Sequence, residues 1–567
     1  MIIDLDKEKL IGTVESVDTA TVIVHVNDPQ LLSAVQVNHL VAIRSSKVGQ
    51  ILIGLVSKII RKIDIQGINE ETEEMLATYD YVKVILVGTF IDAIGTRTNI
   101  FKRTLQSVAE INADCFTMSA ETLSNFMNVI SQSNAMQDNP LKIGKFVLND
   151  SAEAYLDGNK FFQRHAIISG STGSGKSYTV ASLVEQVAKL RSANAILFDI
   201  HGEYSSIKED GILHYKIAGP GDIAAPEIMF LPYWLLTYDE MLALLLDRSD
   251  NNAPNQAAMF SKCVLNNKLE LLKESDNVDS EAQFTIDSPI PYNMEKVLND
   301  LREKDTERVP GEKANTTKQG DYYGKLSRFI QRLENKIMDK RMNFMFSKDQ
   351  MLLQYDYMEK LCRTLLAPAS NNGGIKIIDF SEVPSDVLPL VVSLIARVIF
   401  SVQQWTEKND IHPVALFCDE AHLYIPENAR QGVESSSLSS FERIAKEGRK
   451  YGVSLVVITQ RPSEVNRTVL SQANNFIAMR LTNVDDQNVI KKLLPDNMGD
   501  YAELLPILDV GEAIIVGDAS LLPSRIIIDQ PHHKPISATV DFWDEWSKET
   551  VPDGIGKAVE GLRRQSR

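Results

Sequence analysis

The chain has 567 residues, of which 44% are hydrophobic and 24% are charged, and its formal net charge is −17 at pH 7. This composition is that of an ordinary globular protein, and the length is sufficient for several domains. The acidic balance argues against a surface coated with nucleic-acid-binding side chains, although it leaves room for a local basic channel.

The sequence offers no sign of a membrane or secreted protein. No stretch of about 18 consecutive apolar residues occurs, so we expect no membrane-spanning helix and no membrane partner. Residues 1–8 lack a basic region followed by an apolar core, so we expect no secretory signal. The cysteines at 115, 263, 362 and 418 form no CxxC pair, which argues against a zinc site or a disulfide framework. These features predict a cytoplasmic protein.

Residues 1 to about 100 have the pattern of short β-strands separated by turn residues. The β-branched or apolar runs are Thr19–Val26, His39–Arg44, Gln50–Val56 and Tyr81–Phe90. They predict a small β-barrel, with a β-rich extension of the main domain's sheet as the alternative. A helix is expected near Ala120–Gln132. We place the end of this domain, 1–140, near Gln137–Pro140.

The most informative stretch is Gly170-Ser171-Thr172-Gly173-Ser174-Gly175-Lys176-Ser177, which reads G-x-x-x-x-G-K-S, the pattern of a phosphate-binding loop. An apolar run precedes it and apolar residues at helical spacing follow it, so we expect strand, loop and helix, with the helix N-terminus facing an anion. Glycines let backbone N–H groups approach phosphate oxygens. Lys176 reaches the β- and γ-phosphates, and the Ser177 hydroxyl ligates Mg²⁺. A chance match to a Gly/Ser-rich turn is the disfavoured alternative. We predict that Gly170 through Tyr178 bind ATP.

The next apolar run, Ala195–Ile200, is followed by His201-Gly202-Glu203-Tyr204. Strands that alternate with helices indicate a parallel sheet, whose ligands bind at the C-terminal ends of the strands. Asp199, His201 and Glu203 are therefore expected near the phosphates. A turn residue bonded to the backbone is an equal alternative for His201, whereas a functional role is favoured for Glu203.

Residues 235–370 interrupt the α/β pattern with a predicted helical insertion. Apolar residues recur at helical spacing in Gln256–Leu272, Met294–Leu301, Tyr323–Met338 and Leu352–Leu366. The polar link Arg308–Gln319 is expected to be a solvated loop. Positive charge at Lys313, Lys318 and Arg332 is compatible with nucleic acid, but a solvated face is the favoured interpretation, and we assign the insertion no chemistry.

The α/β pattern resumes at Gly374–Phe380, and the long apolar helix Val387–Gln404 follows. The strand Val414–Cys418 then ends in Asp419-Glu420, which is the Walker B pattern. Asp419 would hold Mg²⁺ through a water, and Glu420 would polarise the water that attacks the γ-phosphate. The adjacent glutamate favours a nucleotide hydrolase over a small-molecule kinase.

A further stretch combines a predicted helix, which ends at Gly452, with the predicted strand Val453–Gln460. Gln460 is expected at the same sheet edge as the P-loop, as a γ-phosphate sensor that orients the lytic water. The alternative is a glutamine that caps the following turn. An arginine lent to a neighbouring subunit would stabilise transition-state charge, although spacing alone favours surface positions for Arg443 and Arg449.

In this order, the motifs GSTGSGKS, DIHGEY, FCDEAHLYIP, KEGRKYGVSL and ITQRPSEV resemble the HerA family, which are RecA-like P-loop ATPases of the group that also contains FtsK-type pumps. The resemblance covers about 140–530, and the N-terminal region resembles the HAS barrel of these proteins. It implies an α/β RecA-like core in two parts, 141–234 and 371–530, around the helical insertion. A C-terminal extension, 531–567, would pack on the neighbouring subunit. The absence of an LSGGQ-like signature argues against ABC proteins.

The resemblance also implies an activity. HerA proteins form hexameric rings that hydrolyse ATP between subunits and drive duplex DNA through a central channel. The implied roles are phosphate and Mg²⁺ binding by Lys176 and Ser177, Mg²⁺ binding by Asp419, catalysis by Glu420 and phosphate sensing by Gln460. Arg449 is favoured over Arg443 as the arginine that acts in trans, because it lies in the EGRKYG string.

HerA proteins usually work with a second protein, and the barrel is their usual docking surface. The partner is a nuclease in DNA end processing, or an anti-phage effector such as a nuclease or a sirtuin-type NADase. The acidic balance and the large insertion favour the defence branch. Two functions therefore stand: a motor that moves double-stranded DNA, or an ATP-driven ring scaffold that regulates a bound effector. The acidic charge favours the scaffold.

Overall fold

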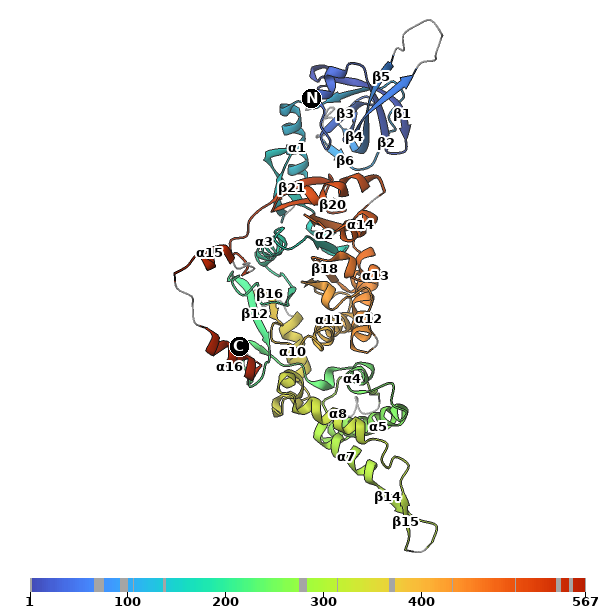
Figure 1. Cartoon of the computed structure of the whole chain (residues 1–567), viewed down its shortest axis with the longest axis vertical. Helices are drawn as coiled ribbons and strands as arrows, with labels where there is room; N and C mark the ends of the chain where they lie inside the picture. The colour runs from blue at the N-terminus through green and yellow to red at the C-terminus, as the bar shows by residue number, and fades with distance from the viewer. Residues whose placement is uncertain are drawn as a thin grey trace. The chain divides into compact units, whose positions relative to one another are not determined.

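The computed structural model describes residues 3–65, 76–91, 100–105, 107–135, 139–274, 283–313, 315–366, 373–430, 432–494, 496–536, 542–549 and 554–565 (Figure 1). The chain divides into two compact units. The first contains Met1–Gln186, Val456–Ser463 and Leu470–Lys534, and the second contains Val187–Leu455, Glu464–Val469 and Pro535–Arg567. We describe each unit by itself.

The first unit begins with a closed antiparallel β-barrel. Its strands are β1 (Leu10–Asp18), β2 (Thr21–Val26), β3 (Leu40–Arg44), β4 (Gln50–Ile65), β5 (Leu76–Ile91), β6 (Ile100–Lys102) and β7 (Asp114–Thr117). The order is β2-β1-β7-β3-β4-β5, pairing of β2 with β5 closes the barrel, and β6 lies beside β5. Val22, Val24 and Val26 alternate into its core, as the period of a strand requires. The predicted barrel is confirmed, and the alternative of a sheet extension is wrong.

The other strands of the first unit form a mixed sheet. Its strands are β8 (Leu141–Phe146), β9 (Asn149–Leu156), β10 (Ala166–Ser169), β18 (Val453–Thr459), β19 (Asn475–Met479), β20 (Glu512–Gly517) and β21 (Ser524–Ile528), and β18 belongs to this unit from Val456 onward. β18, β10 and β19 are parallel, and β20, β21, β8 and β9 continue the sheet as antiparallel neighbours. The parallel strands are continuously buried, as strands covered on both faces are.

The helices of this unit are α1 (Ala120–Ala135), α2 (Gly158–Gln163), α3 (Lys176–Ala188) and α14 (Val484–Leu493). α3 begins after β10, and its last residues, after Gln186, belong to the second unit. α1 confirms the helix predicted near Ala120–Gln132 and packs against β9. Short 3₁₀ helices of the chain are Leu5–Lys7, Pro29–Ala34, Tyr233–Leu235, Lys340–Met342, Gln350–Leu353, Ala421–Leu423, Gly448–Tyr451, Pro462–Glu464 and Asp496–Ile507.

The second unit contains five parallel strands in the order β13-β12-β16-β11-β17. They are β11 (Ala195–Asp199), β12 (Gly211–Ile217), β13 (Ile228–Met229), β16 (Gly373–Asp379) and β17 (Val414–Cys418). Two helices, α11 (Leu388–Trp405) and α12 (Val433–Glu447), pack on each other. α11 is long and apolar enough to cross a membrane, but 72% of it is buried inside the protein, as in a core helix of a globular domain.

The helical insertion belongs to the second unit and confirms the four predicted helical segments. Its helices are α4 (Tyr238–Leu245), α5 (Ala253–Glu274), α7 (Met294–Thr306), α8 (Ser327–Met338), α9 (Asn343–Phe346) and α10 (Tyr357–Leu366). The link Arg308–Gln319, predicted as a loop, contains the antiparallel pair β14 (Arg308–Pro310) and β15 (Thr317–Gln319), which follows α7 in Figure 1.

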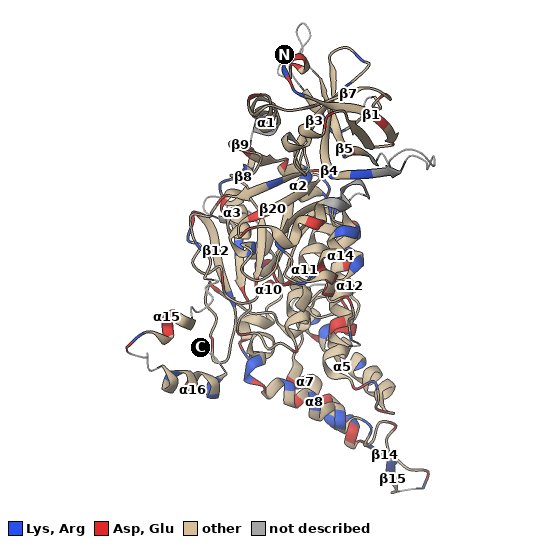
Figure 2. Ribbon diagram, turned by 45° about the horizontal axis from the view of Figure 1, so that its top comes forward, with Lys and Arg blue, Asp and Glu red and all other residues tan. Residues whose placement is uncertain are grey.

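Charges of both signs lie along α7 and α8 (Figure 2). Arg332 pairs with Asp247, and Arg302 pairs with Glu334. Arg332, one of the three basic residues singled out from the sequence, is therefore paired within the insertion, and Lys313 and Lys318 are exposed.

The short helix α13 (Arg467–Ser471) precedes β19. After β21, the chain continues with two helices that expose apolar side chains, α15 (Phe542–Trp546) and α16 (Ile555–Arg564). Neither α15 nor α16 has a buried residue. Their most exposed apolar side chains are those of Phe542, Trp543, Trp546, Ile555 and Leu562.

Candidate active site

The predicted strand, loop and helix are present as β10, the segment 170–175 and α3. Gly173 and Gly175 adopt left-handed backbone conformations, with φ of +74° and +105°. A Cβ atom on Gly175 would lie 3.0 Å from Met479 Cε and 3.4 Å from the Gly511 backbone, whereas one on Gly173 would meet nothing within 4 Å. Gly175 is therefore required for both conformation and space, and Gly173 for conformation alone.

Backbone hydrogen bonds hold the loop in place. Ser171 N–H donates to the Arg480 carbonyl at 2.8 Å, and Gly511 N–H donates to the Ser174 carbonyl at 2.9 Å. Gly170 has a steric role, because a Cβ there would lie 2.4 Å from Ser174 Oγ. The loop is thus held by the segments that follow β19 and precede β20.

Lys176, Ser177 and Tyr178 form the first turn of α3. Lys176 is buried, with an exposure of 8%, while Ser177 and Tyr178 are half-buried. The N–H groups of a first helical turn lack partners within the helix and carry partial positive charge, which suits phosphate oxygens. The Ser177 hydroxyl is an oxygen donor of the kind that Mg²⁺ prefers. The donors of this turn fit a nucleotide phosphate with its metal ion.

Gln460 lies against the P-loop. β10 and β18 are parallel, with Ser169 beside Thr459, so the loop and Gln460 emerge at the same sheet edge. Thr172 Oγ1 donates a hydrogen bond to Gln460 Oε1 at 2.8 Å. The turn after β18 is capped by Thr459, whose Oγ1 accepts from Arg461 N–H at 3.0 Å. Thr459 thus fills the capping role that was the alternative for Gln460.

Asp419 and Glu420 follow the fully buried β17 in the second unit. Both are buried, with exposures of 3% and 7%. Glu420 has φ 45° and ψ 45°, a left-handed conformation that is rare for a residue with a side chain. Tyr424 Oη donates to the Asp419 carbonyl at 2.8 Å, and His422 Nδ1 lies 3.3 Å from Glu420 Oε2.

His422 and Tyr424 were not identified from the sequence. The string Asp-Glu-Ala-His-Leu-Tyr contains them, but its spacing does not reveal that both side chains fold back onto the acidic pair. The signal that was present is a polar residue and an aromatic residue within one turn of a buried strand end.

Asp199 shapes the turn after β11. Its carboxylate accepts hydrogen bonds from the N–H groups of Glu203 at 2.9 Å and Tyr204 at 3.0 Å. Burial raises the pKa of Asp199 to about 6, and the nearby Asp379 acts in the same direction. Asp199 is therefore a turn-forming residue in this structure. His201 is exposed and makes no hydrogen bond among the described residues, which leaves its bonded-turn alternative without support.

The two candidate arginines differ in their contacts. Arg443 lies on α12, where its Nη2 donates to Gln404 Oε1 at 3.0 Å and its guanidinium stands 5.1 Å from the Phe400 ring centroid. Arg449 lies in the 3₁₀ turn Gly448–Tyr451 that follows α12. Its side chain is exposed and forms no ion pair within the described part of the chain. The predicted single helix is thus an α-helix with a 3₁₀ extension that ends at Gly452.

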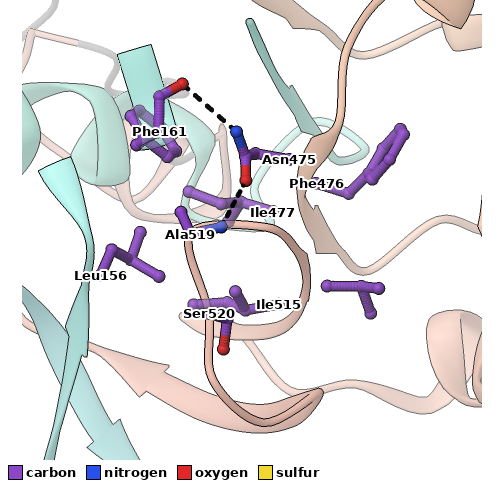
Figure 3. A pocket seen from close by; sticks show the side chains of 9 residues that line it. Leu156, Phe161, Asn475, Phe476, Ile477, Ile515, Ala519 and Ser520 are labelled. Carbon is purple, nitrogen blue, oxygen red and sulfur yellow. Dashed lines mark hydrogen bonds between the residues drawn. The ribbon is translucent and has the colours of Figure 1, made fainter. Parts of the chain in front are cut away.

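A small gap in the first unit, lined mostly by apolar side chains, has no room for a ligand (Figure 3). Two polar side chains, Asn475 and Ser520, are part of its wall. Asn475 donates to the carbonyls of Lys160 at 3.0 Å and His165 at 3.2 Å, and accepts from Ala519 N–H at 2.8 Å. Asn475 is thereby committed to holding the chain segments around it.

Comparisons with known proteins agree with these motifs. The model of the family described as "Helicase HerA, central domain" matches residues 141–399. The curated "DNA double-strand break repair helicase HerA" of Saccharolobus solfataricus is 27% identical over 433 residues, covering 74% of this chain and 75% of the relative. The protein of the same name from Sulfurisphaera tokodaii is 26% identical, covering 73% and 74%.

Among solved structures, the bacterial conjugative coupling protein TrwBdeltaN70 aligns with a TM-score of 0.44 and 13% identity, covering 72% of this chain and 92% of that one. This similarity is too low to carry information about function. The family model spans the P-loop, α3 and β11, and the HerA relatives cover about three quarters of the chain. Residues 141–399 match the central domain of HerA helicases, and the chain is similar to curated HerA helicases over about three quarters of its length.

Proposed function

We propose that this protein is an ATP-driven motor that moves along double-stranded DNA. The observation that carries the ATPase part is the hydrogen bond from Thr172 Oγ1 to Gln460 Oε1, which ties the candidate sensor to the phosphate-binding loop. DNA as the track is supported by relatives that are named DNA double-strand break repair helicases.

The proposed chemistry is hydrolysis of the γ-phosphoryl group. Lys176 and the loop N–H groups bind the phosphates, and Ser177 and Asp419 would hold the Mg²⁺ ion. When bound, that ion neutralises phosphate charge. Glu420 accepts a proton from the attacking water while the oxygen of that water bonds to the γ-phosphorus. The bond between the γ-phosphorus and the β–γ bridging oxygen breaks, which leaves ADP and phosphate. The Gln460 amide orients that water.

We propose a homo-hexamer in which Arg449 acts on the nucleotide of the neighbouring subunit. An arginine that serves another subunit must be exposed and available. Arg449 is exposed and forms no ion pair among the described residues, whereas Arg443 contacts Gln404 and Phe400. The exposed apolar side chains of α15 and α16 support packing of the C-terminal extension on a neighbour.

Within its own chain, the start of that extension is held on α3. The Glu185 carboxylate accepts from His532 N–H and His533 N–H, each at 2.8 Å. The proposed intersubunit contact therefore belongs to the residues beyond this anchor. The barrel is the proposed docking site for a nuclease or NADase effector, with a role in anti-phage defence.

The test is the steady-state ATPase rate with and without duplex DNA. We expect DNA to stimulate turnover, K176A to lose nucleotide binding, and E420Q to bind ATP while losing about 10²- to 10⁴-fold in kcat. R449A should lose about 10³-fold, and the matched control R443A should stay near wild type.

Mixing the variants tests whether Arg449 acts in trans. Rings assembled from R449A and E420Q subunits contain interfaces with an intact Glu420 on one side and an intact Arg449 on the other, so activity should reappear. No recovery in mixed rings would argue against Arg449. An ATPase rate that does not change with DNA but depends on a co-purified partner would favour the ATP-driven scaffold. The net charge of −17 supports this alternative.

A further inference from the structure

We propose that the turn Asp509–Glu512 is the binding site for the base of the nucleotide, with the apolar side chain of Val510 packed against a purine ring. The inference rests on the proposed function, because it takes a nucleoside triphosphate bound at the P-loop as its starting point. Every contact that it uses lies within the first unit.

The order of the strands decides where the base can lie. β10, which leads into the P-loop, lies between β18 on one side and β19 on the other, and β20 follows β19. Gln460, the proposed γ-phosphate sensor, follows β18 and accepts a hydrogen bond from Thr172 of the P-loop. Because phosphates, ribose and base follow one another along the nucleotide, a γ-phosphate near Gln460 directs the ribose and the base towards β19 and β20.

The turn Asp509–Glu512 lies on that side of the P-loop. It leads into β20, which is antiparallel to β19, so the turn emerges at the sheet edge where β10 and β19 end. The Gly511 N–H donates to the Ser174 carbonyl at 2.9 Å, which joins the turn directly to the phosphate-binding loop. A Cβ atom on Gly511 would meet no described atom within 4 Å, so the space beside this contact is open.

Several hydrogen bonds hold the turn in shape. Glu512 N–H donates to the Asp509 carbonyl at 3.1 Å, and the Glu512 carboxylate accepts from Asp509 N–H at 3.0 Å. The same carboxylate pairs with Arg525, and Ile528 N–H donates to the Gly511 carbonyl at 2.9 Å. Gly511 has a φ of +82°, which the third position of such a turn requires. A surface that is fixed before binding loses little conformational entropy when a ligand covers it.

Val510 occupies the exposed corner of this turn. It is 64% exposed, and Ile507, three residues earlier, is 67% exposed, whereas Leu508 between them is 2% exposed. The core of the unit is therefore packed by Leu508 and needs neither of the other two side chains. The faces of a purine ring are flat and largely apolar, so the base gains free energy by covering such side chains. Exposed apolar groups beside a phosphate-binding loop match a ligand that is charged at one end and apolar at the other.

A comparison of a nucleotide with inorganic tripolyphosphate isolates the base, since both carry three linked phosphates. We expect V510A to weaken binding of a non-hydrolysable ATP analogue about tenfold, because two methyl groups are removed from the contact. The affinity for tripolyphosphate with Mg²⁺ should stay within about twofold of wild type. The double variant I507A/V510A should lose more affinity for the analogue than V510A does. Titration calorimetry on the full chain measures both ligands.

V48A is a matched control, because Val48 occupies a turn of the same form in the barrel. Gln50 N–H donates to the Lys47 carbonyl at 3.1 Å, Gly49 has a φ of +75°, and Val48 is 93% exposed. V48A therefore removes the same two methyl groups from an equivalent turn that does not contact the P-loop, and it should change neither affinity.

Steady-state turnover gives a second measurement. A purine ring covers more of an apolar side chain than a pyrimidine ring does, so kcat/KM should be higher for ATP than for CTP in the wild type. V510A should reduce this ratio. An unchanged ratio would contradict a contact between Val510 and the base.

The outcomes distinguish this inference from the proposed function. If the wild type binds neither the ATP analogue nor tripolyphosphate, the proposed function fails, and the inference fails with it. If the wild type binds both, the inference alone is overturned when V510A keeps its affinity for the analogue within twofold. Equal losses for both ligands would also overturn it, because the turn would then only support the P-loop. A change confined to the oligomeric state, measured by light scattering, would assign Val510 to an interface between copies of the chain and not to the base.

Discussion

The P-loop and the turn after β17 use the same left-handed backbone in opposite ways. In the P-loop it is adopted by Gly173 and Gly175, which offer backbone N–H groups and need no side chain. In the turn after β17 it is adopted by Glu420, whose carboxylate is the functional group. The conformational free energy cost is therefore small in the P-loop, where glycines adopt the conformation. In the turn after β17 this cost must be offset by neighbouring hydrogen bonds.

The largest expected effect comes from giving the P-loop a side chain. G175A combines a φ of +105° with a Cβ 3.0 Å from Met479 Cε, so strain and crowding add. We expect ATP affinity to fall about 1,000-fold, which is about 4 kcal/mol. G173A has open space around its Cβ and should lose about tenfold. Titration calorimetry with a non-hydrolysable ATP analogue measures both.

Both glycine variants should keep the circular-dichroism spectrum of the wild type, which serves as the folding control. Equal losses in affinity would show that conformation alone matters at these two positions and that the contact between Gly175 and Met479 is unimportant.

The turn after β11 offers a third arrangement, in which a buried carboxylate caps the backbone. The folded-state pKa of Asp199 is about 6, above the ordinary value of 3.8, so the folded state binds the proton more tightly than the unfolded state. The free energy of unfolding should therefore fall as pH rises from about 4 to about 6, by up to about 3 kcal/mol.

D199N removes this titration and keeps an oxygen that accepts from the backbone. Its stability relative to wild type should rise across the same pH window, as measured by denaturant unfolding at constant ionic strength. A stability difference that does not change with pH would show that the carboxyl is ionised in the folded protein throughout.

These turns also show what the sequence revealed and what it did not. Apolar strands that end at Ser169, Asp199 and Cys418 were predicted, because each is a short apolar run followed directly by a motif. The contacts from Thr172, His422 and Tyr424 were not, since they depend on side-chain directions that spacing does not encode.

The missed strands have a related cause. β7 has four residues, and β1 carries a bulge between Val14 and Ser16 that breaks its alternation. The pair β14–β15 has no buried residue, so its pattern resembles a loop. Pairing between distant segments created these strands, and a local hydrophobic period could not show them.

Removing the Tyr424 hydroxyl tests the support of the turn after β17. Y424F leaves the buried Asp419 carbonyl without this donor and should lower the free energy of unfolding by about 1–2 kcal/mol and reduce kcat. Y233F is the control. Tyr233 precedes the helical insertion, and its Oη donates to the Tyr292 carbonyl at 2.5 Å and accepts from Met294 N–H at 3.0 Å. Because two hydrogen bonds are lost, Y233F should lose at least as much stability as Y424F, with kcat unchanged. A loss of kcat in Y233F would show that ATPase activity follows global stability.

The smallest effect isolates the backbone cost at Glu420 itself. E420A and E420G both remove the carboxylate and should both be inactive, but only glycine adopts φ 45° without strain. We expect E420G to be more stable than E420A by about 1 kcal/mol in denaturant unfolding. A421G, in the same turn, should show the reverse preference because Ala421 has no left-handed backbone. Equal stability of E420A and E420G would mean that the turn relaxes once the glutamate is gone, so that the contacts of the carboxylate impose the left-handed conformation.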